Sequence, residues 1–327
     1  MDFLTEPTLA IAILEVVIGI GLLTKAADEF VEGAVNVAHT LKVSPVVIGA
    51  IIVGFGTSAP EMLVSGIAAS GGNLDLGVGN VVGSNVANLT LVLGVAAMIV
   101  PLIVSPGILA REAPLSLLAV LLFAFFTVGG LALWEGVVML LALVFALGWI
   151  IIGGSGTSQS GLEIDAESSF GKQLFRTLVG LVGTVLGAQL LVWGALAIAA
   201  VVGITGGMVG FTLVAVGTSL PELVTAAVSA RKGETELILG NLLGSNIFNS
   251  LAVGGLIAVI GAGPIVDSGL ASVGIAGMAV VAFGAWFFMV TRKRVHKLEA
   301  GVLLVAWLVS VILLANQTEG VVAVLGL

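Results

Sequence analysis

One polar phrase occurs twice in otherwise apolar sequence, and each copy ends in a glutamate that directly follows a proline. The first copy, GTSAPE, runs from Gly56 to Glu61, and the second, GTSLPE, runs from Gly217 to Glu222. A carboxylate at the centre of a membrane costs about 2.5–3.5 kcal/mol or more, so it is a functional candidate by default. Because the chain carries this cost twice, the pair predicts one centre in which two carboxylates bind a cation.

Each proline leaves backbone oxygen without a partner beside its glutamate. Pro60 has no N–H and its ring clashes with the preceding turn, so the carbonyl of Gly56 loses its helical hydrogen bond. Non-helical backbone is tolerated in hydrocarbon only where it lines a polar cavity, and a cation supplies the missing partner. Thr57 lies four residues before Glu61, so a hydroxyl, the freed carbonyl and the carboxylate share one helix face. The second phrase repeats this arrangement.

A second polar pattern follows each phrase at the same distance, as GNVVGSN (79–85) and GNLLGSN (240–246). In each copy, positions i, i+4 and i+8 form a stripe along one helix face. The stripe residues are Asn80, Ser84 and Asn88 in the first copy and Asn241, Ser245 and Asn249 in the second. All of them offer oxygen, so the set predicts a hard cation such as Ca²⁺ or Na⁺ instead of zinc or copper.

Other small and polar residues of these patterns have a structural interpretation. Asn85 and Asn246 point about 100° away from the stripe, and we expect them to make structural hydrogen bonds. Membrane helices also use glycine at close helix–helix contacts, and the Gly79…Gly83 spacing is typical of such packing. We interpret the glycines as packing residues and the two glutamates as functional ones.

The composition is that of a polytopic membrane protein. The chain has 327 residues, of which 59% are hydrophobic and only 9% charged, whereas soluble domains average roughly 25% charged residues. It contains no cysteine, which excludes disulfides, thiolate metal sites and cysteine nucleophiles. Asp2 and Glu6 precede the first apolar run, which has no basic region before it. We therefore expect that run to be a retained helix and not a signal peptide.

Ten apolar stretches are long enough to cross about 30 Å of hydrocarbon, which takes some 20 helical residues. They lie near 9–38, 44–70, 75–100, 113–130, 133–152, 171–200, 206–230, 236–262, 270–291 and 299–315. A Gly- and Ser-rich segment, 153–171, is interpreted as a cytoplasmic polar linker between the fifth and sixth stretches. These features predict an all-α membrane protein with one five-helix repeat at 1–152 and a second at 172–327.

The two halves are expected to cross the membrane in opposite directions, because each contains an odd number of spans. Inverted repeats of this kind are typical of secondary transporters, whose substrate site lies at the midplane between broken helices. With the N-terminus outside, ten of the 11 basic residues fall in or beside odd-numbered connections, and only Lys25 lies within a span. The positive-inside rule then places both termini outside the cytoplasm, in the cell membrane.

The paired GTSxPE and GNxxGSNxxN phrases resemble those of the sodium/calcium exchanger family of the cation/calcium exchanger superfamily, in its prokaryotic form without regulatory domains. The resemblance covers both halves and implies four adjacent cation positions. Ca²⁺ would bind Glu61, Glu222 and the carbonyls of Thr57 and Thr218. Na⁺ would use the same carboxylates with Gly54, Thr57, Ser58 and Ser84 on one side and Ala215, Thr218, Ser219 and Ser245 on the other. Asn88 and Asn249 would border the middle position.

The resemblance implies a secondary antiporter that exports Ca²⁺ in exchange for Na⁺ by alternating access. The ions would be its substrates, and neither an enzymatic activity, a cofactor, a nucleic acid nor a protein partner is indicated. Exchange of Ca²⁺ for H⁺ or another cation at the same site is the alternative. Asn249 is an aspartate in certain prokaryotic members, where an acid in this region is associated with potassium dependence. Asparagine here argues against K⁺ co-transport and leaves Na⁺ and H⁺ open.

The first helix carries four charges in its later half, Lys25, Asp28, Glu29 and Glu32. Lys25 and Asp28 are three residues apart, so they form either a structural ion pair within the membrane or part of a gate. In the resembling family, this helix and its mate near 171–200 look like the gating pair.

Overall fold

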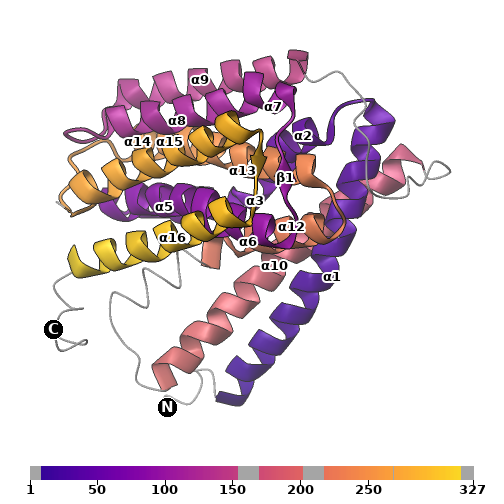
Figure 1. Cartoon of the computed structure of the whole chain (residues 1–327). Coiled ribbons are helices and arrows are strands. Elements are labelled where there is room, and N and C mark those ends of the chain that lie inside the picture. Colours follow the sequence, from indigo (N-terminus) through magenta and orange to yellow (C-terminus); the bar gives the residue numbers. More distant parts are fainter. Residues whose placement is uncertain (1–8, 154–168, 202–216, 268, 318–327) are drawn as a thin grey trace.

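The computed structural model describes residues 9–153, 169–201, 217–267 and 269–317, and these residues are almost entirely helical (Figure 1). In the first half the elements are α1 (Leu9–Leu41), α2 (Pro45–Ile48), η1 (Gly49–Val53), α3 (Gly54–Thr57), α4 (Ala59–Ser70), α5 (Leu74–Ala87), η2 (Asn88–Val92), α6 (Leu93–Ile99), β1 (Leu102–Ile103), α7 (Pro106–Ala110), α8 (Glu112–Phe126) and α9 (Leu133–Gly153).

In the second half they are α10 (Phe170–Val201), α12 (Leu220–Arg231), α13 (Thr235–Ile247), η3 (Phe248–Val253), α14 (Gly254–Ile260), η4 (Leu270–Gly274), α15 (Ile275–Arg292), β2 (Arg294–Val295) and α16 (Lys297–Gln317). The η elements are π-helical turns that continue into the neighbouring α-helices.

Helices of membrane-spanning length lie where the sequence predicts them. Within the described residues, seven helices are long and apolar enough to cross a membrane, and an eighth is the bent pair 45–57 and 59–70. Helices α12 and α16 stand at the seventh and tenth predicted spans. Residues 206–216 of the seventh span and 154–168 of the linker lie outside the described residues. The all-helical membrane fold is confirmed.

The breaks in the two site helices follow from their prolines. Between α3 and α4 the chain bends by 43° at Ser58, and Pro60 then occupies the first turn of α4. Ser219 has nearly the same backbone angles before α12, whose first turn holds Pro221. A proline fits a first helical turn because its missing N–H would have no partner there. Each break therefore starts a new helix immediately before a site glutamate.

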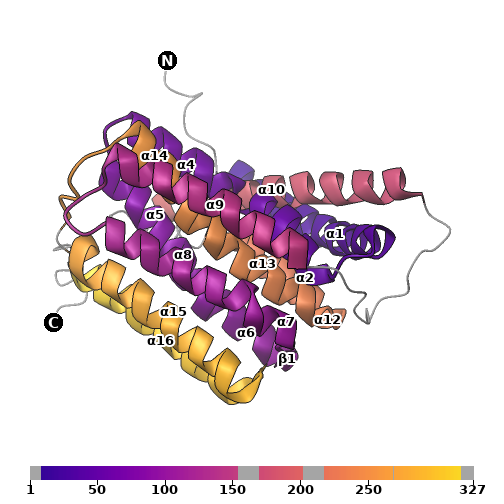
Figure 2. The ribbon, with the colours of Figure 1, turned by 90° about the horizontal axis from the view of Figure 1, so that it is seen from above.

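The helices after the two breaks form the centre of the bundle. The spans 74–99 and 235–260 are the most buried of the seven, with 72% and 83% of their apolar windows inside the protein. Helices α8, α9, α15 and α16 cover them on one side (Figure 2). Strands β1 and β2 form a short antiparallel pair, Leu102 opposite Val295, which two-residue segments are too short to predict from periodicity.

Glycines allow several helices to approach closely. A Cβ added at Gly244 would strike the backbone of Ala50, and one at Gly240 would strike that of Val46. Packing is thus confirmed for these glycines of the second polar pattern. Gly79 differs, since an added Cβ would lie 3.8 Å from Leu270, an ordinary contact.

Helices α1 and α10 form a tightly packed pair at one side of the bundle (Figures 1 and 2). A Cβ added at Gly187 of α10 would lie 2.6 Å from the backbone nitrogen of Leu23 in α1, and one at Gly180 would lie 2.5 Å from that of Phe30. Backbone atoms cannot move aside as side chains do, so these glycines set the spacing of the pair.

Gly187→Ala should therefore destabilise the protein by about 1–3 kcal/mol, the usual cost of overpacking. Gly21→Ala on the facing helix is the matched control, since its Cβ would have no neighbour within 4 Å, and alanine is the better helix former. Thermal unfolding in detergent should show a lower midpoint for Gly187→Ala only. Equal midpoints would show that the two helices are not held at this distance.

Candidate cation-binding site

Glu61 and Glu222 occupy equivalent places in the two halves, and both side chains are fully buried. Glu61 lies in the first turn of α4, and Glu222 lies in the first turn of α12. A helix N-terminus carries partial positive charge, which favours a carboxylate there. The break before each helix thus places one acid in a position that tolerates it, deep inside the protein.

The stripe on α5 faces Glu61. The hydroxyl of Ser84 donates to Oε1 of Glu61 at 3.4 Å, and Nδ2 of Asn80 donates to its backbone carbonyl at 3.3 Å. Asn80 also donates to the buried hydroxyl of Ser65 at 2.9 Å. Ser65 lies outside both repeated motifs, so their spacing does not predict this contact. Thr218 of the second phrase donates to Oδ1 of Asn80 at 3.5 Å.

The stripe on α13 contacts the first phrase, just as Asn80 of the first stripe contacts Thr218 of the second phrase. Oγ1 of Thr57 lies 3.3 Å from both Oδ1 of Asn241 and Oγ of Ser245. Ser245 also reaches the carbonyl oxygen of Gly54 at 3.5 Å. Thr57 and Ser245 face the carboxylate of Glu222, whereas Thr218 and Ser84 face that of Glu61. Each glutamate is therefore surrounded by hydroxyls from both halves.

Several buried oxygens of this region have no hydrogen-bond partner among the described residues. They are Oε2 of Glu61, both carboxylate oxygens of Glu222, Oγ of Ser58 and Ser219, and Oδ1 of Asn88 and Asn249. Buried polar side chains are nearly always hydrogen-bonded, so a cluster of exceptions requires an explanation. All of these atoms are ligands that a hard cation accepts. Two carboxylates with neutral oxygens around them therefore fit a cation as their common partner.

The asparagines divide between this region and the surrounding packing. Asn85 donates to Ser250 at 2.9 Å and to the sulfur of Met278 at 3.5 Å, which is the structural role expected for it. Asn246 instead accepts from Nδ2 of Asn88 at 3.2 Å, so it joins the two halves next to the stripe. Helical periodicity alone does not reveal this contact. Neither polar atom of the Asn249 side chain has a hydrogen-bond partner among the described residues.

Two predicted features have other outcomes. Ala215 lies outside the described residues. Lys25 and Asp28 do not pair: Oδ1 of Asp28 lies 3.2 Å from Nζ of Lys232, and Lys25 is exposed and has no ion pair within the described part of the chain. Of the two alternatives for this pair, the local ion pair is wrong, because the carboxylate of Asp28 reaches Lys232 at the end of α12 instead.

A buried pair of acids between broken, inverted helices defines a membrane transporter of cations and not an enzyme. Residues 11–152 and 172–316 match the model of the sodium/calcium exchanger protein family, so the chain belongs to this family. It is thus an integral membrane protein and a cation/calcium exchanger.

Individual relatives match most of the chain. The putative antiporter CaxA of Alkalimonas amylolytica is 35% identical over 91% of this chain and 97% of its own. The sodium/calcium exchanger MaX1 of Methanosarcina acetivorans is 32% identical over 74% of this chain and 81% of its own. Among solved structures, the sodium-calcium exchanger NCX_Mj soaked with Na⁺ and Sr²⁺ superimposes with a TM-score of 0.84 at 29% identity. That match covers 93% of this chain and 99% of the other.

Asn249→Asp should change the monovalent partner more than it changes Ca²⁺ affinity. A third carboxylate beside two others is repelled by them, and a proton or a monovalent cation relieves this repulsion. Ca²⁺ uptake measured against pH and counter-ion should therefore show a steeper pH dependence, with the half-saturating Ca²⁺ concentration moved only modestly.

Asn85→Asp is the matched control, because it adds the same charge away from the stripe. It should cost stability without changing the counter-ion profile. Superimposable profiles for Asn249→Asp and the wild type in Na⁺, K⁺ and pH would place residue 249 outside the ion site.

Proposed function

We propose that this protein is a secondary antiporter that exports Ca²⁺ from the cytoplasm in exchange for Na⁺ by alternating access. The observation that carries the proposal is the pair of fully buried glutamates, one from each half, whose carboxylate oxygens lack hydrogen-bond partners among the described residues. Two carboxylates balance the charge of one Ca²⁺ ion.

In this proposal, neutral oxygens complete the shell around the bound ion. Ca²⁺ takes six to eight oxygen ligands, and backbone carbonyls are common among them. The carbonyls of Thr57 and Thr218 stand one turn before the glutamates, beside the proline breaks. Within the described residues, no group of three or more acidic, histidine or cysteine side chains could hold a metal. Carbonyls, hydroxyls and amides must therefore supply the remaining ligands.

Sodium would bind at the two flanks of the same centre. The oxygens proposed for it are those of Gly54, Thr57, Ser58 and Ser84 on one flank and of Ala215, Thr218, Ser219 and Ser245 on the other. Two observations on the described residues support these sodium positions. They are the hydroxyl contacts around the glutamates and the hydroxyls of Ser58 and Ser219, which have no hydrogen-bond partner there. Asn88 and Asn249 would border the middle position with their amide oxygens.

Alternating access would use the inverted relation of the halves 1–152 and 172–327. Equivalent broken helices enter the site from opposite directions, so rocking one part against the other exposes the same ions to either side. In this proposal both termini lie outside the cell membrane and the 153–171 linker lies in the cytoplasm, and the distribution of basic residues supports this orientation.

Glu61→Gln and Glu222→Gln should each abolish Ca²⁺ transport, because Ca²⁺ requires negatively charged oxygen and the amide retains only the shape. The measurement is Ca²⁺ uptake into proteoliposomes driven by an outward Na⁺ gradient. Glu135→Gln is the control, since it removes an acid whose carboxylate accepts the backbone N–H of Ala132 at the start of α9, away from the two helix breaks. Near wild-type exchange by either site mutant would contradict the shared centre, and uptake driven only by a pH gradient would identify a Ca²⁺/H⁺ exchanger.

Transport should carry net charge if Na⁺ is the counter-ion. One Ca²⁺ leaves a site with two carboxylates roughly neutral, whereas three Na⁺ leave it with about one positive charge. Moving that charge across the membrane is worth about 2.3 kcal/mol per 100 mV. Ca²⁺ uptake in vesicles clamped by valinomycin should therefore respond to the imposed potential. A flux that ignores the potential would indicate electroneutral exchange, with two Na⁺ or two H⁺ per Ca²⁺.

A further inference from the structure

The helix face that carries Glu222 continues as a polar stripe toward the end of α12. Thr225, Ser229 and Lys232 follow Glu222 at three, seven and ten residues, a spacing that keeps all four on one side of the helix. The hydroxyls of Thr225 and Ser229 are buried and have no hydrogen-bond partner among the described residues.

Such hydroxyls are unusual within a membrane helix. Ser and Thr there commonly bond to the carbonyl four residues back, as Thr177 and Thr184 do on α10. Thr225 and Ser229 do not, so they leave buried polar groups along the line from Glu222 to the helix end. An ionisable residue at membrane depth marks an ion pathway, and these two hydroxyls extend the polar face of Glu222 from that residue toward the helix end.

The three stripe positions after Glu222 are polar in only one half of the repeat. The residues 161 positions before Thr225, Ser229 and Lys232 are Val64, Ala68 and Gly71, none of which offers a polar side chain. The stripe is therefore an addition to the symmetric site, at the end of α12 that the positive-inside rule assigns to the cytoplasm.

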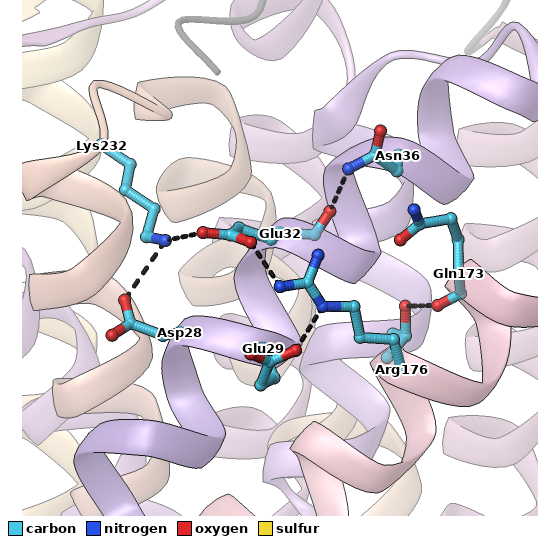
Figure 3. Close-up of polar contacts among 8 residues, drawn as sticks. Asp28, Glu29, Glu32, Asn36, Gln173, Arg176 and Lys232 are labelled. Carbon is cyan, nitrogen blue, oxygen red and sulfur yellow. Dashed lines mark hydrogen bonds and ion pairs between the residues drawn. The ribbon is translucent and has the colours of Figure 1, made fainter. Parts of the chain in front are cut away.

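An ion-pair cluster lies at the end of this stripe (Figure 3). Nζ of Lys232 lies 2.6 Å from Oε1 of Glu32 and 3.2 Å from Oδ1 of Asp28. Nη2 of Arg176 lies 2.5 Å from Oε2 of the same Glu32, and Nε of Arg176 pairs with Glu29. Glu32 thus connects a lysine at the end of α12 with an arginine of α10.

The cluster fastens the α1–α10 pair to the helix that carries Glu222. These two helices pack on each other through backbone contacts at Gly180 and Gly187, so they form one body. Lys232 comes from outside this body. The repeat mates of the three acids are Gln189, Leu190 and Trp193, so they do not provide an equivalent cluster at the other end.

We propose that the Glu222–Thr225–Ser229 stripe lines the cytoplasmic route to the ion site, and that the cluster of Asp28, Glu29, Glu32, Arg176 and Lys232 is a latch that closes this route. The proposal rests on the proposed exchange function and on the predicted orientation. In their side chains Lys232 is 17% and Glu32 34% exposed. The cluster is thus partly exposed, and water that reaches Asp28 and Glu32 weakens each ion pair, which suits a contact that must break in every transport cycle.

The test uses a single introduced thiol, which is unique because the chain contains no cysteine. Ser229→Cys is treated in inside-out membrane vesicles with a membrane-impermeant methanethiosulfonate reagent. Breaking the latch with Glu32→Gln should raise the labelling rate about fivefold or more, the size of a typical conformational coupling. Lys232→Ala should act alike, and Lys232→Arg should restore slow labelling.

Two variants serve as matched controls. Arg231→Ala removes an exposed charge next to Lys232, and Lys25→Ala removes one from α1; neither should change the labelling rate. Ala68→Cys, at the repeat mate of residue 229, should not respond to Glu32→Gln from the cytoplasmic side. Monodisperse elution and an unchanged unfolding midpoint establish that each labelled variant is folded.

The outcomes separate the latch from the exchange function, because labelling requires no transport. Equal labelling of Ser229→Cys with and without the latch would overturn the proposal even if Ca²⁺ exchange were demonstrated. Acceleration seen only in right-side-out vesicles would overturn the assignment to the cytoplasmic side. Acceleration in inside-out vesicles would support the latch even if the counter-ion proved to be H⁺.

Discussion

Two carboxylates share the interior of one apolar bundle, and the rest of the structure follows from the need to hold them there. A buried carboxylate needs a paired charge, a coordinated metal or a bound proton. Glu61 and Glu222 have no lysine or arginine beside them among the described residues. The helix breaks, the hydroxyls and the asparagine stripes all bring neutral oxygen to this place, and neutral oxygen cannot replace a counter-charge. The cation proposed to bind here would supply that counter-charge.

The internal symmetry is close at the site and is lost toward the ends of the helices. Around the glutamates, Thr57 meets Ser245 and Thr218 meets Asn80, so each half contributes to the surroundings of the other. Away from the centre, the repeat mates of Asp28, Glu32 and Lys232 carry no charge. Binding the same ions from either side requires the symmetric part. The charged residues Asp28, Glu32 and Lys232, which have no charged repeat mates, can distinguish one side of the membrane from the other.

The sequence predicts the functional centre better than it predicts the contacts around it. The two glutamates, the prolines and the stripes are visible because a polar residue in a membrane helix is rare and their spacing repeats. The ten spans are visible because hydrocarbon thickness fixes helix length. The π-helical turns at Asn88 and Phe248 are not, since they shift the backbone hydrogen bond by one residue without a change in composition. Likewise, Lys232 is distant in sequence from Asp28, whereas Lys25 is near, and only the packed structure shows which of them is the partner.

The crosswise contacts have a consequence for how the protein is made. The ribosome delivers the first half, with Glu61 and Ser84, well before α12 and α13 exist. Until those helices insert, this half holds one buried acid without its partner acid and without the hydroxyl of Thr218. Such an intermediate carries the cost of a carboxylate in hydrocarbon, and only Ser84 and the first turn of α4 offset it. Insertion of the second half then supplies the remaining partners of Glu61, so the surroundings of this glutamate are complete only when both halves are in place.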